Sequence, residues 1–222
     1  ARLLPDDFLA ARMREQPPGT RPVRQLGGLV IVPFMLAGMV VAIAMFPDRW
    51  PMLGALTVAL GLLWAVGIAD DRRHLSVGLR LAVQLVAAGM VAFTVEPGHA
   101  VFDGMLPWWG ERLLAVAGLV WFVNMTNFMD GMDMMTAVGL GMPLLWCFSI
   151  QLENSPLAAP LLLAVGTLFG FAVVNRPPAS VYLGDNGSLP LGLIAGASGL
   201  YLCLRTGPVA GLLPFGYYLA DS

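Results

Sequence analysis

The hydrophobic positions of this chain gather into long apolar runs that are separated by short polar segments. Seven runs have nearly the length of a membrane-crossing helix, and an eighth begins near Pro208. The seven cover residues 29–46, 54–69, 77–95, 113–128, 135–150, 157–174 and 189–204. Crossing a bilayer core takes about 20 apolar residues, so the shorter runs are expected to end within protein. The pattern predicts an all-α, polytopic integral membrane protein with about seven complete transmembrane helices and a truncated eighth.

Composition supports this prediction and narrows the classes of partner. Hydrophobic residues make up 58% of the chain and charged residues only 12%, against about 25% charged in soluble domains. A soluble globule and a disordered chain are both excluded. The net charge of −2 offers no basic surface for nucleic acid, so the lipid bilayer is the first expected partner.

The connections between the runs are short, which predicts one membrane domain over residues 27–222 and a cytoplasmic N-terminal segment over residues 1–26. The first residue is Ala1, and the last residues follow an apolar stretch. We therefore expect the domain to be truncated at both ends.

The arginines predict the orientation, because basic residues favour the cytoplasmic side of a membrane protein. Eight of the twelve basic residues fall in alternate segments, on the side of the N-terminal tail: Arg2, Arg12, Arg14, Arg21, Arg24, Arg72, Arg73 and Arg176. Only Arg49, Arg112 and Arg205 fall on the other side. Arg80 lies about one turn inside the third run, and we expect it to snorkel to the inner face.

Polar residues of a different kind cluster on the same inner side. Asp70 and Asp71 end the second run, the fourth ends in a motif of asparagines and aspartates, and a Gly-Asp-Asn-Gly-Ser segment precedes the seventh. The residues of interest are Asp70, Asp71, Asn124, Asn127, Asp130, Asp133, Asn175, Tyr182, Gly184, Asp185 and Ser188. We expect the fourth helix to end near Gly131, so that the side chains of its motif face one pocket. Ser188 is expected to be the N-cap of the next helix.

These residue types indicate a hard cation and a phosphate ligand. Carboxylates at a membrane edge are unfavourable unless they are paired or bound to metal. All the candidate ligands carry oxygen donors, and the absence of Cys or His clusters argues against zinc. Mg²⁺ is commonly held by one or two carboxylates together with substrate phosphates. The alternative interpretation is a set of solvated helix ends.

Jointly, the motifs resemble those of the polyprenyl-phosphate N-acetylhexosamine-1-phosphate transferases, the MraY, WecA and WbpL types of glycosyltransferase family 4. The resemblance rests on Asp70-Asp71, on Asn124-x-x-Asn127-Phe-Met-Asp130-Gly-x-Asp133, and on Asn175 with Pro-Ala-Ser-Val-Tyr-Leu-Gly-Asp-Asn-Gly-Ser at residues 178–188. Order, spacing and sidedness agree across nearly the whole chain. The Asn-Phe-Met-Asp-Gly sequence resembles the lipopolysaccharide and O-antigen branch more than the peptidoglycan branch.

The resemblance implies a reaction in which an N-acetylhexosamine-1-phosphate passes from a UDP-sugar, such as UDP-GlcNAc, to undecaprenyl phosphate, with release of UMP. This would be the first membrane step of a cell-envelope polysaccharide pathway, on the cytoplasmic face of a bacterial inner membrane. Direct displacement and an aspartyl intermediate both stay open, as does a homodimer.

The resemblance also implies roles for individual residues. Mg²⁺, with Mn²⁺ as an alternative, would be held by Asp185 and Asn127. Asp70, Asp71 and Asp133 would be catalytic, with the first two handling the lipid phosphate and one of them acting as its base. The substrate-binding residues would be Asn124, Asn127, Asp130, Asn175, Tyr182, Gly184 and Ser188, with Tyr182 near the uracil.

Two positions depart from the family pattern. Arg24-Gln25 stands where the family commonly has Pro-Arg, and Met134 stands where a glycine usually follows the second aspartate. A catalytically impaired paralogue is therefore one alternative. A secondary transporter with intramembrane carboxylates is another, although transporters place such groups nearer the midplane.

Overall fold

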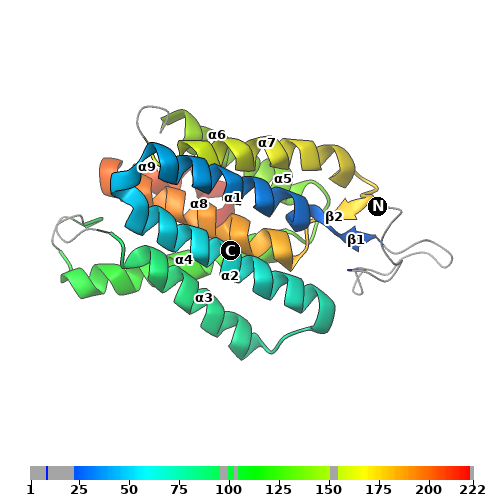
Figure 1. The fold of residues 1–222 in the computed structure, drawn as a ribbon, viewed down its shortest axis with the longest axis horizontal. Helices are drawn as coiled ribbons and strands as arrows, with labels where there is room; N and C mark the ends of the chain where they lie inside the picture. The colour runs from blue at the N-terminus through cyan, green and yellow to red at the C-terminus, as the bar shows by residue number, and fades with distance from the viewer. Residues whose placement is uncertain (1–8, 10–22, 96–99, 103–104, 151–154, 221–222) are drawn as a thin grey trace.

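In the computed structural model, the chain forms a bundle of helices, most of which run nearly lengthwise (Figure 1). The structure describes residues 9, 23–95, 100–102, 105–150 and 155–220, so most of the predicted N-terminal segment lies outside the described residues. Five helices are long and apolar enough to cross a membrane, and two apolar regions are shorter. These seven helical regions match the seven predicted runs, which confirms the all-α membrane architecture.

The long helices have lengths between 18 and 24 residues. They are α1 (Gly27–Met45), α2 (Trp50–Arg73), α4 (Trp108–Met129), α7 (Ala158–Asn175) and α8 (Asp185–Thr206). A short 3-10 turn, η1 (Pro47–Arg49), leads directly into α2. The third run forms the shorter helix α3 (Val77–Ala92), whose N-cap is Ser76.

The fifth predicted span is divided into two helices, α5 (Met135–Gly139) and α6 (Gly141–Ile150). Two glycines flank the break, and glycine destabilises a helix interior. Pro143 has no N–H, so it cannot complete the helical hydrogen bond to the carbonyl of Gly139. The eighth run is also divided, into α9 (Pro208–Leu212), η2 (Leu213–Phe215) and α10 (Gly216–Ala220).

Helix α8 lies at the centre of the bundle, where α1, α2 and α4 pack against it, and α7 packs on the outside against α1 and α6 (Figure 1). Its side chains are buried almost continuously from Asn186 to Gly199. Glycines on α8 let α4 approach closely, because a Cβ at Gly192 would lie 2.7 Å from the Cα of Val123. Such small-residue contacts are typical of helix packing in membranes.

The surrounding helices expose apolar side chains on their outer faces. Val40 is 65% exposed and Phe128 is 78% exposed. In water such side chains would be unfavourable, whereas hydrocarbon chains accept them. This arrangement suits a bundle that is enclosed by lipid.

Two local predictions concern the C-terminal end of α4 and the N-terminal end of α8, which carry the sequence motifs. Helix α4 ends at Met129, with Asp130 as its C-cap, which confirms the predicted end near Gly131. The prediction that Ser188 is an N-cap is wrong, because α8 begins at Asp185 with Gly184 as its N-cap. The chain enters the helix one turn earlier because Gly184, at φ +77°, adopts a conformation that other residues rarely adopt.

A two-residue parallel ladder lies at the same end of the bundle. Strand β1 (Arg24–Gln25) pairs with β2 (Val181–Tyr182), with Gln25 opposite Tyr182. The N–H of Gly28 also donates to the carbonyl of Leu183 at 3.1 Å. The start of α1 is thereby fastened beside the start of α8.

Candidate active site

Four helices bring polar side chains together at one end of the bundle, which is called the site end below. Asp70 and Asp71 lie in the last turn of α2, and Arg80 lies in the first turn of α3. Asn127 belongs to the last turn of α4, and Asp185 is the first residue of α8. The predicted motifs therefore meet in space, although they are up to 115 residues apart along the chain.

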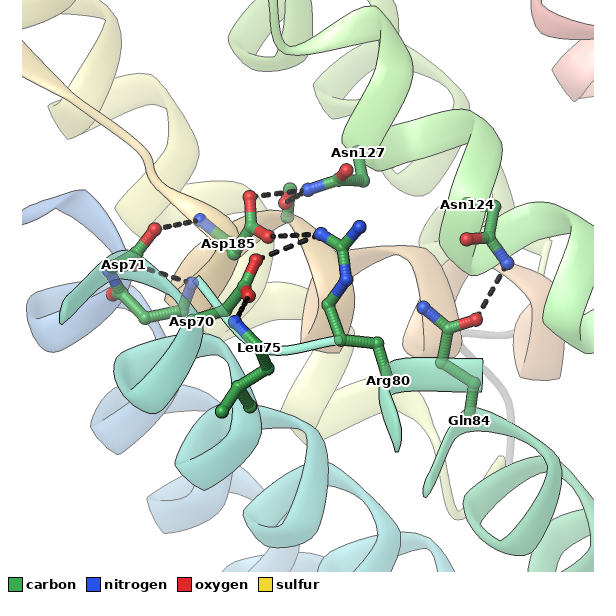
Figure 2. Close-up of polar contacts among 10 residues, drawn as sticks. Asp70, Asp71, Leu75, Arg80, Gln84, Asn124, Asn127 and Asp185 are labelled. Atoms are coloured by element: carbon green, nitrogen blue, oxygen red, sulfur yellow. Dashed lines mark hydrogen bonds and ion pairs between the residues drawn. The ribbon is translucent and has the colours of Figure 1, made fainter. Parts of the chain in front are cut away.

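Arg80 joins two of the acids. Its Nη1 atom lies 2.8 Å from Oδ2 of Asp70 and 3.4 Å from Oδ2 of Asp185, and its side chain is 31% exposed (Figure 2). Asp70 also accepts a hydrogen bond from the N–H of Leu75 at 2.6 Å. An opposite charge at such distances stabilises ionised carboxylates. The side chain of Arg80 thus reaches the acid cluster at the end of α2 and the start of α8, a pairing that sequence reasoning did not anticipate.

Asn127 contacts Asp185 from the other side. Its Nδ2 atom donates to Oδ1 of Asp185 at 2.7 Å and to Oγ of Ser188 at 2.9 Å (Figure 2). Ser188 is fully buried, so its hydroxyl serves to orient Asn127 rather than to cap a helix. Asp185 is thus held between an amide and a guanidinium.

Asp71 points away from Arg80 and toward the backbone of α8. Its Oδ1 accepts from the N–H of Asp185 and its Oδ2 accepts from the N–H of Asn186, both at 3.0 Å. The Nδ2 of Asn186 also donates to Asp71 at 2.5 Å and to the carbonyl of Gln25 at 3.0 Å. The two adjacent acids of the Asp-Asp pair therefore have different surroundings.

Two glycines make room for the start of α8. A Cβ on Gly67 of α2 would lie 2.5 Å from the Cα of Asn186, and a Cβ on Gly28 of α1 would overlap the side chain of Asn186. Asn186 itself is fully buried. Sequence reasoning missed Gly28, Gly67 and Asn186 as site-forming residues.

A second group of predicted residues lies in the segments that follow α4 and α7. Thr136 donates to Oδ1 of Asp130 at 2.6 Å, and burial raises the pKa of Asp130 to about 8. The N–H of Ala179 donates to Asp133 at 3.2 Å, which ties the segment after α4 to the segment after α7.

Asn175 and Tyr182 complete this second group. Asn175 accepts from the N–H of Met134 at 2.6 Å and donates to the carbonyl of Val181 at 2.9 Å. Asn175 is buried and Tyr182 is half-buried in β2. The amide of Asn175 thus connects the turn before α5 with the strand that leads to Gly184 and Asp185.

Asn124 lies apart from the acid cluster. Its Nδ2 donates to Oε1 of Gln84 at 2.7 Å and to the carbonyl of Val120 at 2.8 Å. Figure 2 shows this amide pair on the far side of Arg80 from Asp71. Of the four polar residues of the α4 motif, the structure brings Asn127, Asp130 and Asp133 to the site end and turns Asn124 toward α3.

Arg80 and Gln84 are the residues of α3 that sequence reasoning did not assign to the site. A signal for both exists, because they are the two strongly polar side chains of an otherwise apolar run, four residues apart. Polar side chains at membrane depth are seldom retained without a partner. Their spacing of one helical turn places both on one face of α3, where Arg80 reaches Asp70 and Asp185 and Gln84 reaches Asn124 of α4.

The donor set is compatible with a divalent cation. Among the described residues, no three Asp, Glu, His or Cys side chains form a ready-made metal site. Asp70 and Asp185 nevertheless converge on one cationic group, the Arg80 guanidinium. Mg²⁺ needs only one or two protein carboxylates when substrate phosphates complete its shell, so Asp185, with Asn127 beside it, fits such an ion.

Comparison with known proteins agrees with the site geometry. Residues 52–203 match the family model described as Glycosyl transferase family 4. The chain is 31% identical over 207 residues to decaprenyl-phosphate N-acetylglucosaminephosphotransferase of Mycolicibacterium smegmatis, covering 83% of this chain and 51% of the relative. It is 33% identical over 222 residues to phospho-N-acetylmuramoyl-pentapeptide-transferase of a Synechococcus species, covering 89% and 58%.

A third relative is the probable undecaprenyl-phosphate N-acetylglucosaminyl 1-phosphate transferase of Bacillus subtilis. It is 29% identical over 179 residues, with 76% of this chain and 48% of the relative covered. The chain thus spans about half the length of these relatives. The family match covers well over half of the chain and contains every motif residue from Asp70 to Ser188. The chain therefore belongs to glycosyl transferase family 4, with the polyprenyl-phosphate N-acetylhexosamine-1-phosphate transferases that its motifs resemble.

Proposed function

We propose that the protein transfers an N-acetylhexosamine-1-phosphate from a UDP-sugar to undecaprenyl phosphate and releases UMP. The observation that carries the proposal is the meeting of Asp70, Arg80 and Asp185 at the site end, from three different helices. In this arrangement the guanidinium can bind a phosphate, and a neighbouring carboxylate can bind a metal ion. The relatives, which are named for transfers to decaprenyl or undecaprenyl phosphate, support the same chemistry.

The reaction brings two highly charged groups together. An oxygen of the lipid phosphate attacks the sugar-bearing phosphorus of the UDP-sugar and forms a new P–O bond. The bond from that phosphorus to the bridging oxygen breaks, and UMP leaves with the oxygen and its electron pair. Because both reactants are anionic, the site must supply positive charge.

The residues of this chain divide that task. Arg80 contributes a fixed positive charge, and Asp70 beside it lies where the attacking phosphate would be received. Asp185, oriented by Asn127, would be the protein ligand of Mg²⁺, with Mn²⁺ as an alternative. When bound, the ion would offset charge on the diphosphate and on the leaving UMP.

The second group of residues suits the nucleotide and the sugar. Asp130, Asp133 and Tyr182 come from segments that Asn175 connects, beside the start of α8. Asp130 is held in this group by the hydroxyl of Thr136, which donates to it at 2.6 Å. We assign uridine and sugar binding to this side, with the lipid phosphate on the side of Arg80.

The arginine bias of the sequence supports an orientation with the site end in the cytoplasm, and the bacterial relatives support an inner membrane location. A UDP-sugar is a cytoplasmic metabolite, so this orientation gives the site access to its donor. The Asn-Phe-Met-Asp-Gly motif favours the lipopolysaccharide or O-antigen branch, and UDP-GlcNAc is then the first donor to examine.

The proposal is tested with the full-length protein in detergent, with Mg²⁺ and undecaprenyl phosphate. UDP-GlcNAc, UDP-GalNAc and UDP-MurNAc-pentapeptide are offered separately, and UMP is measured by chromatography. We expect UMP from a UDP-N-acetylhexosamine and none from the pentapeptide donor. Asp185→Asn should lower the rate at least 100-fold with an unchanged elution profile, whereas Asp48→Asn at the opposite end should not. Absence of UMP with every donor would overturn the proposal.

A further inference from the structure

We infer that Asp71 is a positioning residue, which caps helix α8 from across the bundle and so holds Asp185 in place. Asp70 is then the one acid of the pair that faces the substrate phosphates. The assignment to Asp70 rests on the proposed function, whereas the capping role of Asp71 rests on geometry alone. It replaces the symmetric expectation, drawn from the sequence, that both acids handle the lipid phosphate.

The first turn of α8 shows why a distant cap is needed. A helix begins with four backbone N–H groups that have no partner within the helix. The N–H groups of Gly187 and Ser188 donate to the carbonyl of Gly184, both at 3.0 Å. Those of Asp185 and Asn186 both donate to the carboxylate of Asp71. The bond from Ser188 is the first regular bond of the helix. Of the N–H groups of residues 185–187, which have no such bond, two are satisfied by Asp71 of α2 and the third by the carbonyl of Gly184.

Helix α8 has no room for a cap of its own. Its N-cap residue is Gly184, which has no side chain and a φ of +77°. A Cβ at this position would lie 2.7 Å from Nδ2 of Asn186 and 2.8 Å from Oδ2 of Asp71. Serine or aspartate, the usual capping residues, would therefore be both strained and obstructed. The carboxylate of Asp71 occupies the space where such a side chain would be.

The surroundings of the two acids differ in the way that this division of roles requires. Asp71 accepts three hydrogen bonds, all from residues 185 and 186, and its negative charge suits the positive end of the helix dipole. Acting as a base would require it to give up part of this cap. Asp70 instead accepts from Leu75 and pairs with Arg80, the group that can bind a phosphate.

Capping by Asp71 fixes the backbone of Asp185 itself. Asp185 is the first residue of α8, so the bond from its N–H sets where its side chain starts. A displacement of about 1 Å at a catalytic group can lower a rate by about 100-fold. Asn186 extends the same support, because it links Asp71 with the carbonyl of Gln25 in β1.

The direct test is hydrogen exchange of the full-length protein in lipid nanodiscs, followed by mass spectrometry of peptides that span residues 184–189. Asp71→Asn keeps the size of the side chain but replaces one acceptor oxygen with an NH₂ group. We expect exchange in this peptide to become roughly tenfold faster, in line with the loss of a capping residue. The matched variant Asp70→Asn should leave it unchanged.

Two further measurements separate positioning from general-base catalysis. Mn²⁺ binding, followed by electron paramagnetic resonance, should weaken about tenfold in Asp71→Asn because Asp185 is displaced. The rate of UMP release should fall at every pH. Its pH profile should keep the acid limb of the wild type, which is the decline in rate as the catalytic base becomes protonated at low pH. Asn186→Ala, which removes one donor to Asp71 and leaves the backbone cap, should show the same changes to a smaller extent. It provides the test if Asp71→Asn does not fold.

Unchanged exchange and unchanged Mn²⁺ binding in both Asp71→Asn and Asn186→Ala would overturn the positioning role. Loss of the acid limb in Asp71→Asn alone would likewise overturn it and assign the base to Asp71. Exchange needs no substrate, so the cap is tested even if no donor yields UMP. In that case the proposed function fails, and with it the assignment of Asp70 to the substrate phosphates.

Discussion

Met134 has a backbone conformation that glycine adopts more easily than methionine. Its φ of +65° and ψ of −8° lie in the left-handed region, at the position where the resembling family usually has glycine. Its N–H donates to Asn175 at 2.6 Å, so the conformation is fixed by a bond that joins two segments of the site. A residue with a Cβ adopts this region at a cost of about 1 kcal/mol or more.

The strain at Met134 leads to a prediction about stability. Met134→Gly should raise the free energy of unfolding by up to about 1 kcal/mol, because glycine removes the strain but adds chain entropy of roughly 0.5–1 kcal/mol. Met134→Val should lower it by more than about 1 kcal/mol, because a β-branched residue is especially unfavourable there. Thermal unfolding in detergent checks the order Gly, Met, Val. The reverse order would contradict a left-handed residue 134.

Arg80 yields a prediction that links stability to a divalent ion. Arg80→Gln leaves Asp70 and Asp185 without their shared cation. We expect a loss of about 1–2 kcal/mol, less than for a fully buried pair because Arg80 is 31% exposed. Mg²⁺ should then raise the unfolding midpoint more in the variant than in the wild type, since the ion binds only the folded site.

The control for this prediction is Arg73→Gln, which removes an exposed arginine at the end of α2. Its midpoint should respond to Mg²⁺ as the wild type does. Differential scanning fluorimetry at several Mg²⁺ concentrations gives the comparison. An equal response in all three proteins would contradict the view that Arg80 neutralises the carboxylates to which the ion binds.

Helix α8 depends on close approach by α2, and Gly67 tests this contact. A Cβ on Gly67 would meet the backbone of Asp185 and Asn186, so Gly67→Ala should push the two helices apart. Overpacking of this kind costs about 1–3 kcal/mol, and UMP release should fall with it because Asp185 moves. Gly61→Ala is the matched control on the same helix, where a Cβ would meet nothing within 4 Å.

Gly61→Ala should be neutral or stabilising by up to about 1 kcal/mol, because alanine favours the helix. Both variants are compared by their unfolding midpoints and by their rates of UMP release. Equal behaviour of the two variants would show that the contact between Gly67 and α8 contributes nothing to the site.

Helices and motifs differ in how far the sequence reveals them. The apolar runs predict every membrane-length helix because burial in lipid depends on local composition. The break between α5 and α6 lies within one continuous apolar run, so apolar length alone does not reveal it, although the glycines around Leu140 and Pro143 are a local signal for it. The convergence of Asp70, Asn127 and Asp185 was predictable from their shared membrane edge.

The direction of each side chain was not predictable in the same way. Asp70 and Asp71 are neighbours in sequence, yet they face Arg80 and the α8 backbone respectively. Which face each acid occupies depends on where α3 and α8 pack against α2. Ser188 was misplaced as a cap for the same reason, because local capping is a default expectation that a nearby partner, here Asn127, overrides.

The two ends of the bundle use their buried charges differently. At the end opposite the site, Glu111 is buried and accepts from the N–H groups of Val101 and Phe102, both at 3.0 Å. Arg112 is also buried and donates to the carbonyl of Val95 at 3.0 Å. These charges hold loop backbone in place. At the site end, charged side chains face one another, which leaves an arrangement that a charged substrate can enter.

This difference between the two ends of the bundle leads to a prediction about its orientation in the membrane. Gly78 is exposed beside the site, where a Cβ would meet nothing within 4 Å, and Asp48 is exposed in η1 at the opposite end. The native Cys147 and Cys203 are both buried, so they give little background in thiol labelling. A cysteine introduced at either exposed position therefore reports which side of the membrane that end faces.

In intact cells, with the outer membrane made permeable, a membrane-impermeant maleimide should label Asp48→Cys. Gly78→Cys should be labelled only after the inner membrane is opened, because the arginine-rich side of the chain is expected in the cytoplasm. Each labelled fraction is measured by gel shift against the fully denatured protein. Labelling of Gly78→Cys in closed cells would place the site end outside, where a cytoplasmic UDP-sugar could not reach it, and would contradict both the orientation and the proposed donor.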